Sequence, residues 1–354
     1  DSRAFVAALN AGEFDWAEIK LAGVEIHTRV DKMKAALQAG GYSSDLVRYI
    51  SELRDLFFED AYGLAGFRLA GKNLPAAVQA LCTGLQWDCT SETWHKGPGV
   101  QHINADAYAA CGAGCSGNPY DQSWGVGPRG WGESHELGHN LQKGMLNVYA
   151  GRSGEVSNNM FPLHKEWRIY RELGENNDDT RVKYRSAFDM IKAASAEGDK
   201  VEGAYTRIWG SDAYAVQNGE RMAFYMQWVH YWEERTGDPA RGWDLFTLLY
   251  LHQRQFEKGD WATYKDRLGY STYASRPSVN GNDNLLIALS WITQRDQRAM
   301  FDLWGVRYSP EAAAQVQSYG FAKETPRFYA NRVTNDHSTV VRVDMTAPNP
   351  AWPF

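Results

Sequence analysis

The segment 132–142 contains a His-Glu-x-x-His motif, whose side chains could bind a metal ion and activate a water molecule. On an α-helix, four residues advance about 400°, so His135 and His139 would lie one turn apart on nearly the same face and could bind one ion. Glu136 would point to the flank of this pair, where it could act as a general base on metal-held water without binding the metal itself. The motif therefore predicts one catalytic Zn²⁺ and hydrolysis of an amide bond.

A catalytic zinc ion usually has three protein ligands and one open position, so a further ligand is expected downstream. The two candidates are Glu155 and Glu166. Glu155 is favoured because Ser-Asn-Asn follows at 157–159, and these small polar groups could hydrogen-bond a ligand carboxylate. Glu166 stands among charged and aromatic residues, a pattern typical of a solvated helix face, and stays an alternative.

The residues around the motif favour a helix. A glycine-rich approach ends at Gly132, and Ser134 is expected to cap the first turn. Leu137 and Leu141 would face a core. Gly138, between the two histidines, has no side chain and would let another backbone or a substrate come close, at a cost of about 1 kcal/mol relative to Ala.

Two runs of the sequence, His-Glu-Leu-Gly-His-Asn-Leu-Gln at 135–142 and Glu-Val-Ser-Asn-Asn at 155–159, resemble the enhancin-like family of gluzincin metallopeptidases. That family includes viral enhancins and secreted bacterial enzymes that attack mucins and other O-glycosylated proteins. Trp-Asp-Leu-Phe at 243–246 and the stretch from Asp302 to Ala312 are similar to the family's helical C-terminal half. The resemblance spans about 101–321.

The resemblance implies a secreted bacterial zinc endopeptidase that acts on O-glycosylated proteins. Its ligands would be His135, His139 and Glu155, with Glu136 as the catalytic glutamate. Pro162 departs from the family pattern, because it falls where the helix carrying Glu155 would continue; we expect it to begin a second helix and leave the first one short.

Composition limits the classes of function. The 354 residues are 44% hydrophobic and 23% charged, as in an ordinary globular protein that can bury a substantial core. The net charge of −6 and the lack of a basic run argue against a nucleic-acid partner, and no apolar run is long enough to span a bilayer. The chain begins with Asp1 and shows no signal peptide, so we expect a mature protein or an excised catalytic domain, and a monomer.

Four cysteines form two close pairs in sequence. We expect the local disulfides Cys82–Cys89 and Cys111–Cys115, and with them an oxidising, extracellular location. The alternatives are four free thiols or a structural zinc ion held by all four, although the spacings do not match the usual Cys-x-x-Cys pattern.

The N-terminal part is expected to hold a small mixed sheet. Residues 24–30 alternate like a strand with His27 on its surface, residues 43–59 form an amphipathic helix capped by Ser44, and 74–81 form another helix. Residues 99–110 also alternate like a strand. By analogy with gluzincin folds, this strand is placed at the sheet edge beside the zinc helix, where an extended substrate could add to it.

The loop 111–132 is glycine-rich and aromatic, which favours a functional role beside a catalytic helix. Trp124 could stack on the apolar face of a sugar, and Tyr120 and Asn159 are further candidates for binding substrate. Arg181, in a polar loop after the ligand residues, could hydrogen-bond sugar hydroxyls. The alternative is that the aromatic residues only pack the loop and that Arg181 lies in a solvated loop.

The C-terminal half is expected to be helical. Helical periodicity covers 220–234, 243–256, 284–303 and 311–317; a strand is expected at 339–344 and an irregular tail at 347–354. The fold class is therefore α+β, a gluzincin-type metallopeptidase with an N-terminal sheet subdomain at 1–130, a zinc-helix and helical subdomain at 131–325 and a C-terminal strand and tail at 326–354.

A donor that stabilises the oxyanion is also expected. The candidates are Tyr205, Tyr214, Tyr225 and His230, and the sequence does not choose among them. Four other histidines have no ligand spacing and are expected to be structural or on the surface: His95, His164, His252 and His337. Two other functions stay open, a general zinc peptidase without a glycan requirement and a glycan-binding module with a vestigial metal site.

Overall fold

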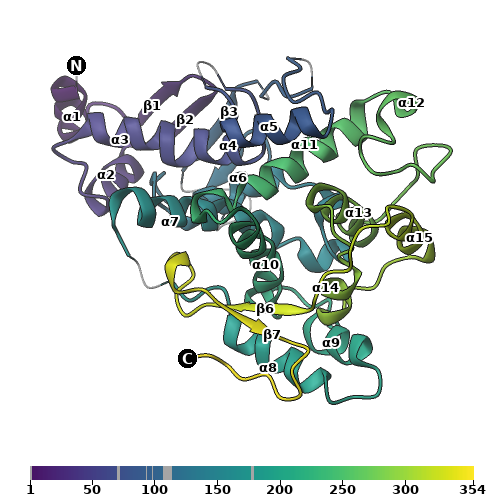
Figure 1. Ribbon diagram of the computed structural model, residues 1–354. Helices are drawn as coiled ribbons and strands as arrows, with labels where there is room; N and C mark the ends of the chain where they lie inside the picture. Colours follow the sequence, from purple (N-terminus) through teal and green to yellow (C-terminus); the bar gives the residue numbers. More distant parts are fainter. Residues whose placement is uncertain (1, 70–71, 93, 98, 107–113, 177–178) are drawn as a thin grey trace.

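The computed structural model describes residues 2–354 except 70–71, 93, 98, 107–113 and 177–178. A small sheet and its helices form the N-terminal part, and helices dominate the rest (Figure 1). The predicted α+β class is confirmed. Most of the buried hydrophobic side chains among the described residues, from Leu9 to Ala330, belong to one continuous hydrophobic core.

Five strands form the N-terminal sheet in the order β1-β2-β3-β5-β4: β1 (Trp16–Leu21), β2 (Val24–Arg29), β3 (Gln101–Ala105), β4 (Gly114–Cys115) and β5 (Tyr120–Gln122). The β1–β2 and β4–β5 pairs are antiparallel, and β3 is parallel to both of its neighbours. The expectation that 99–110 forms the edge strand is therefore wrong: β3 is central and β4 is the edge. Residues 107–110 of that segment lie outside the described part of the chain.

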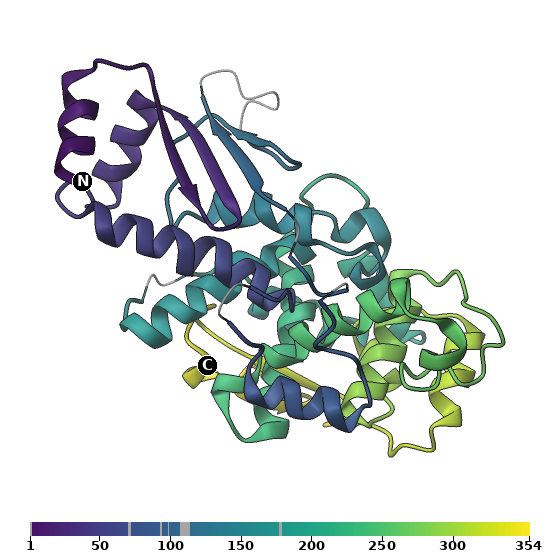
Figure 2. The same ribbon diagram turned by 90° about the horizontal axis from the view of Figure 1, so that it is seen from above.

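Helices α1 (Ser2–Ala11) and α2 (Val30–Ala39) lie at one end of the sheet, and a long helix runs beside it (Figure 2). That helix consists of α3 (Leu46–Glu52), a π-helical stretch η1 (Leu53–Glu59) and α4 (Asp60–Leu64). Asp45, not Ser44, caps it by accepting a hydrogen bond from the amide of Arg48 at 3.0 Å. Tyr49 donates to the carbonyl of Val126 at 2.8 Å. This hydrogen bond holds the loop that precedes the helix beginning at Trp131.

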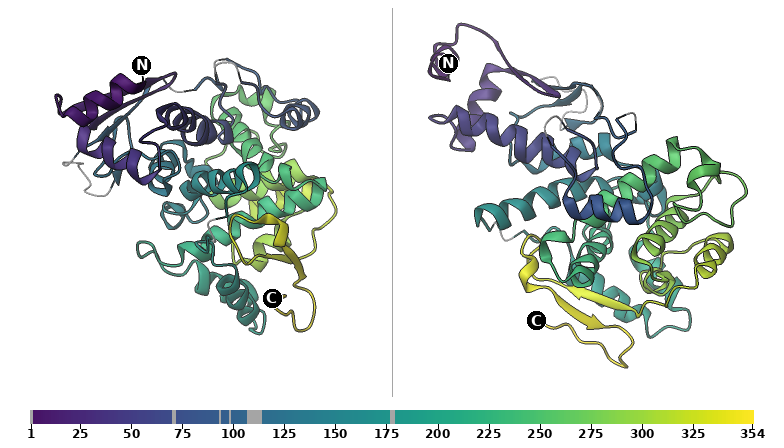
Figure 3. Two further views of the ribbon diagram at one scale, coloured as in Figure 1. Left: turned by 90° about the vertical axis from the view of Figure 1, so that its left-hand side faces the viewer. Right: turned by 45° about the horizontal axis from the view of Figure 1, so that its top comes forward.

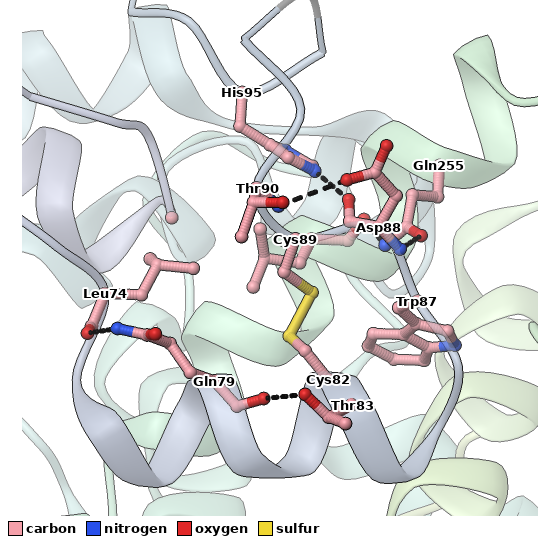
Figure 4. Close-up of a disulfide and its surroundings, with 12 residues drawn as sticks. Leu74, Gln79, Cys82, Thr83, Trp87, Asp88, Cys89, Thr90, His95 and Gln255 are labelled. Atoms are coloured by element: carbon pink, nitrogen blue, oxygen red, sulfur yellow. Dashed lines mark hydrogen bonds between the residues drawn. A yellow bond between two sulfur atoms is a disulfide. The ribbon is translucent and has the colours of Figure 1, made fainter.

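The predicted Cys82–Cys89 disulfide is present and closes a short loop after α5 (Ala76–Gly84) (Figure 4). This loop rests on the helical half of the molecule, because the amide of Asp88 donates to Gln255 Oε1 at 2.9 Å and Trp87 donates to the carbonyl of Arg267 at 2.6 Å. The second predicted pair, Cys111–Cys115, includes a residue outside the described ranges.

The C-terminal half consists of helices joined by short 3₁₀ turns. The helices are α6 (Trp131–Leu141), α7 (Met160–Leu173), α8 (Tyr184–Ala194), α9 (Lys200–Ile208), α10 (Asn218–Thr236), α11 (Asp244–Lys258), α12 (Trp261–Tyr264), α13 (Gly281–Thr293), α14 (Arg298–Leu303) and α15 (Pro310–Ser318). The turns are η2 (Gly144–Leu146), η3 (Ala150–Ser153), η4 (Ser157–Asn159), η5 (Pro239–Arg241) and η6 (His337–Thr339). Long continuous runs of α10 and α11 are buried, 221–233 and 244–256, which makes this pair the centre of the helical part.

Two predicted elements end differently from expectation. The helix expected over 284–303 is divided into α13 and α14, because Gln294 adopts a left-handed conformation with φ of 52°. The late strand is β7 (Val341–Asp344), which pairs with β6 (Arg327–Ala330). This hairpin packs against α8 and α10, at the opposite end of the molecule from the N-terminal sheet (Figure 3).

Candidate metal centre

His135, His139 and Glu155 converge on one point. The Oε2 atom of Glu155 lies 3.2 Å from His135 Nε2 and 3.5 Å from His139 Nε2. Each residue thus offers one ligand atom to a common centre, and all three are partly exposed. Two imidazole nitrogens and a carboxylate oxygen with solvent access form a donor set that fits a divalent transition metal with an open coordination position.

The start of α6 is set by buried polar groups. The helix begins at Trp131 after Gly130, and the carbonyl of Gly130 accepts a hydrogen bond from Lys165 Nζ at 2.5 Å. The buried carboxylate of Glu133 accepts from the amide of Gly127 at 2.6 Å. Ser134 lies inside the helix and is buried, so the expectation that it caps the first turn is wrong.

Close backbone packing brings Glu155 to the histidines. A Cβ atom added at Gly138 would lie 2.4 Å from the carbonyl oxygen of Asn158, so only glycine lets η4 approach α6 this closely. Glu155 lies in a turn between η3 and η4, not in a helix as we expected. Pro162 is the third residue of α7, where the missing amide hydrogen has no helical acceptor to lose.

Two amide side chains orient the histidines. Asn159 Oδ1 lies 2.7 Å from His135 Nδ1, and Asn159 Nδ2 donates to the backbone carbonyl of Glu155 at 2.8 Å. Gln142 Oε1 lies 3.2 Å from His139 Nδ1, and Gln142 Nε2 donates to the carbonyl of Gly154 at 2.8 Å. Both contacts make Nδ1 the protonated nitrogen and leave Nε2 free for a metal.

Asn159 is therefore buried behind a ligand, and the expectation that it binds substrate is contradicted by this position. Its neighbour Asn158 is fully buried, with Nδ2 at 3.0 Å from His139 Nε2 and 3.2 Å from His135 Nε2. The Oδ1 atom of Asn158 has no hydrogen-bond partner among the described residues. The atom of Asn158 that faces the two imidazoles is therefore Nδ2.

Glu136 faces the edge strand of the sheet. An ideal Cβ atom at Gly114, on β4, would lie 2.8 Å from Glu136 Oε1 and 2.9 Å from the ring of Trp124. The half-buried Trp124 ring also lies against Gly132, at the start of α6. Glu136 and Trp124 thus border the same glycine, and any side chain at position 114 would collide with both.

Electrostatics keep the third ligand ionised. Hydrogen bonds from His135 and His139 lower the pKa of Glu155 to about 2, although burial alone would raise it. Burial would lower the pKa of His139, but hydrogen bonds to Glu155 and Gln142 and the charges of Glu155 and Glu136 raise it overall. Glu155 is therefore a carboxylate at neutral pH, which is the form that binds a cation.

Among the four candidate oxyanion donors, Tyr214 is the one whose pKa is shifted by the charges of the metal centre. The charge of Glu155, followed by slight burial and the charge of Glu136, raises the pKa of Tyr214, whose side chain is 81% exposed. Tyr225 instead donates to the carbonyl of Leu146 at 2.8 Å inside the core. Tyr205 packs under Arg307, and His230 is buried in a separate cluster.

Glu166, the alternative third ligand, lies elsewhere. It is buried on α7 and its Oε1 lies 3.5 Å from Arg181 Nη1, so the expectation of a solvated helix face is wrong. The adjacent Lys165 is fully buried, and burial lowers the pKa of its ammonium to about 8. These side chains support the start of α6 and do not reach the metal centre.

Two of the expected substrate-binding residues have structural contacts. Tyr120 is fully buried and donates to Gln122 Oε1 at 2.6 Å, which contradicts a direct contact with substrate. Arg181 is half-exposed; its guanidinium stacks 4.2 Å from the centre of the Trp131 ring and pairs with Asp179 at 3.2 Å. The roles of Gln142 and Gly114 were not predicted from the sequence: Gln142 lies only three residues after His139, but its other contacts and those of Gly114 join separate segments.

Comparison with known proteins agrees with this geometry. A family model described as Peptidase M60, enhancin and enhancin-like matches residues 91–305. The chain is 56% identical over 357 residues to a protein of Pseudomonas aeruginosa named immunomodulating metalloprotease; the match covers 99% of this chain and 39% of that protein. The chain thus spans about two fifths of the length of this curated relative.

Solved structures show the same relationship. A structure titled IMPa from Pseudomonas aeruginosa in complex with an O-glycopeptide has a TM-score of 0.95 and 55% identity, covering 100% of this chain and 41% of that one. A structure of IMPa metallopeptidase in complex with T-antigen has a TM-score of 0.94 and 55% identity, over 99% and 40% of the two chains. A metallopeptidase structure from Bacteroides thetaiotaomicron shares the fold, with a TM-score of 0.54 at 11% identity over 94% of this chain and 50% of that one. On the matched segment, the identity and the converging ligands, the chain belongs to the Peptidase M60, enhancin and enhancin-like family.

Proposed function

We propose that this chain is a catalytic domain of a secreted bacterial zinc endopeptidase that cleaves proteins carrying mucin-type O-glycans. The observation that carries the proposal is the convergence of His135, His139 and Glu155 next to the unligated carboxylate of Glu136. Two imidazoles and one carboxylate are the ligands found in many zinc hydrolases. A bound zinc ion supplies a Lewis acid and lowers the pKa of water at the open position.

The protein residues have separate roles in the reaction. Glu136 takes a proton from the attacking water and delivers it to the leaving amine, which requires a carboxylate that the metal does not hold. Tyr214, whose phenol is protonated at neutral pH and lies within the field of Glu155 and Glu136, donates its hydroxyl hydrogen to the oxyanion of the tetrahedral intermediate. Asn159 and Gln142 hold the two imidazoles in the orientation that presents Nε2.

The edge strand β4 suits an extended peptide. Gly114 lets β4 lie directly against Glu136, and an extended substrate backbone could pair with the edge of β4 beside this carboxylate. Trp124 borders the same space and provides an apolar surface for a sugar ring, and the exposed part of Arg181 is available for sugar hydroxyls. The solved relatives with an O-glycopeptide and with T-antigen support a glycosylated substrate.

Two observations support a secreted protein. The Cys82–Cys89 disulfide suits an oxidising compartment. The relative from Pseudomonas aeruginosa is named as an immunomodulating protease, which fits action outside the bacterial cell. Across the described residues, no helix has the length and apolar character needed to cross a bilayer.

The test uses a mucin-type glycoprotein before and after enzymatic removal of its O-glycans. We expect cleavage of the glycosylated form only, loss of cleavage with retained zinc for Glu136→Gln, and loss of zinc for Glu155→Ala. Equal cleavage of both forms would indicate a general zinc peptidase. A wild-type protein that binds no zinc would instead indicate a glycan-binding module.

A further inference from the structure

The sheet carries a second group of metal-binding side chains on the face turned away from the core. Along β2 the buried residues are Val24, Ile26 and Thr28, so Glu25 and His27 point to the opposite face. His102 on β3 pairs in register with Glu25, and Glu18 on β1 pairs with His27. Figure 2 shows the ribbons of the sheet, and the strand register brings two imidazoles and two carboxylates from three of its strands onto one surface.

The side chains are close enough to share an ion. The ligand atoms of Glu25, His27 and His102 all lie within 4.8 Å of one another. His27 Nδ1 lies 3.2 Å from Glu18 Oε1, and His102 Nδ1 lies 3.5 Å from Glu25 Oε2. The two imidazole rings stack with centroids 5.9 Å apart and planes 16° apart, so they lie side by side on the sheet surface.

This group differs from the other histidine cluster outside the active centre. His230 and His337 place Nδ1 at 2.9 and 2.6 Å from the two oxygens of Glu233, and Tyr184 lies 2.8 Å from His230 Nε2. That cluster is buried and its carboxylate already accepts two hydrogen bonds, so we interpret it as structural. The cluster on the sheet is open to solvent, with side-chain exposures of 35% for His27 and 42% for His102.

The ammonium group of Lys20 already contacts this group of side chains and would compete with a metal ion. Lys20 Nζ lies 2.5 Å from Glu25 Oε1, and the remaining oxygen of Glu25 faces His102. The Lys20 side chain is 80% exposed and can move into solvent without losing packing, so a divalent ion could replace it. Neutral imidazoles with carboxylates favour Zn²⁺ or Cu²⁺ over Ca²⁺ or Mg²⁺.

We propose that Glu25, His27 and His102, with Glu18 at the rim, form a second divalent transition-metal site that is separate from the catalytic centre. An ion bound there joins β2 to β3, two strands that residues 30–100 separate in sequence. It therefore stabilises the sheet that presents the β4 edge to substrate. The site does not depend on the function proposed above, because none of its residues belongs to the His-Glu-x-x-His centre.

The test measures zinc stoichiometry by isothermal titration and Cu²⁺ coordination by electron paramagnetic resonance. We expect two zinc equivalents for the wild type, one for Glu155→Ala, and none for Glu155→Ala combined with His27→Ala and His102→Ala. In the Glu155→Ala background, where His135 and His139 can still hold Cu²⁺, the two-imidazole signal of the second site should be the part that is lost when His27→Ala and His102→Ala are added. Asn104→Ala is the matched control: it lies on the same sheet face, in register with His27, and should leave the second equivalent unchanged.

Lys20→Gln provides an independent check. Removal of the competing ammonium should tighten the second zinc site several-fold while leaving the first unchanged. All variants change partly exposed side chains, so each should retain the wild-type melting temperature when zinc is absent. The proposal is overturned if the wild type binds no second equivalent at 100-fold excess zinc, or if the His27→Ala and His102→Ala changes leave the second equivalent in place.

Discussion

Asn159→Ala should weaken metal binding at the catalytic centre without unfolding the protein. The side chain holds His135 Nδ1 at 2.7 Å and the carbonyl of Glu155 at 2.8 Å, so it links two of the three proposed ligands. Each hydrogen bond contributes about 0.5–1.5 kcal/mol, which gives a loss of about 1–3 kcal/mol for both. That range corresponds to a roughly 5-fold to 150-fold weaker affinity for zinc.

The assay is competition for zinc against a chromophoric chelator, with hydrolysis of a glycoprotein measured at limiting and at saturating zinc. We expect Asn159→Ala to lose activity at limiting zinc and to recover most of it at saturating zinc. Asn159→Asp keeps an acceptor for His135 Nδ1 and should retain most of the affinity. An Asn159→Ala affinity within twofold of the wild type would refute the positioning role of this side chain.

Three further predictions concern other parts of the molecule. Tyr214→Phe should lower kcat by about 10²-fold with little change in KM or zinc content, because one oxyanion donor is lost; an unchanged kcat, measured by steady-state kinetics, would exclude this role. Burial would raise the pKa of Glu233, but the charge of His230 and hydrogen bonds from both histidines lower it to about 2, so its stabilisation of about 3 kcal/mol is present above pH 4.5 and is lost as the pH falls toward 2. Glu233→Gln should remove that dependence in denaturant unfolding measured at several pH values, and a wild-type slope in the variant would contradict it. Replacement of Cys82 and Cys89 by serine should cost about 2–3 kcal/mol of unfolding free energy for a loop this short, as thermal unfolding would show; no loss would argue against the disulfide in solution.

The chemical identity of the candidate centre could be predicted from the sequence because it depends on local periodicity. A spacing of four residues places two histidines on one face of any helix, so His135 and His139 needed no knowledge of the fold. The small polar residues after Glu155 were expected to hydrogen-bond the ligand carboxylate, but the partners of Asn159 are the His135 imidazole and the backbone carbonyl of Glu155. Gly138 was correctly expected to permit a close backbone approach.

The contacts between separate segments of the chain could be determined only from the tertiary structure. The position of β4 as the edge strand, the burial of Tyr120 and Glu166 and the placement of Tyr214 near Glu155 all depend on how strands and helices pack. A pattern within one segment cannot predict these contacts, because the side chains come from different segments and meet only when the core forms. By itself, the sequence determined which residues could bind the metal, and only the packing of η4 and β4 against α6 determined how those residues are oriented and where a substrate can reach them.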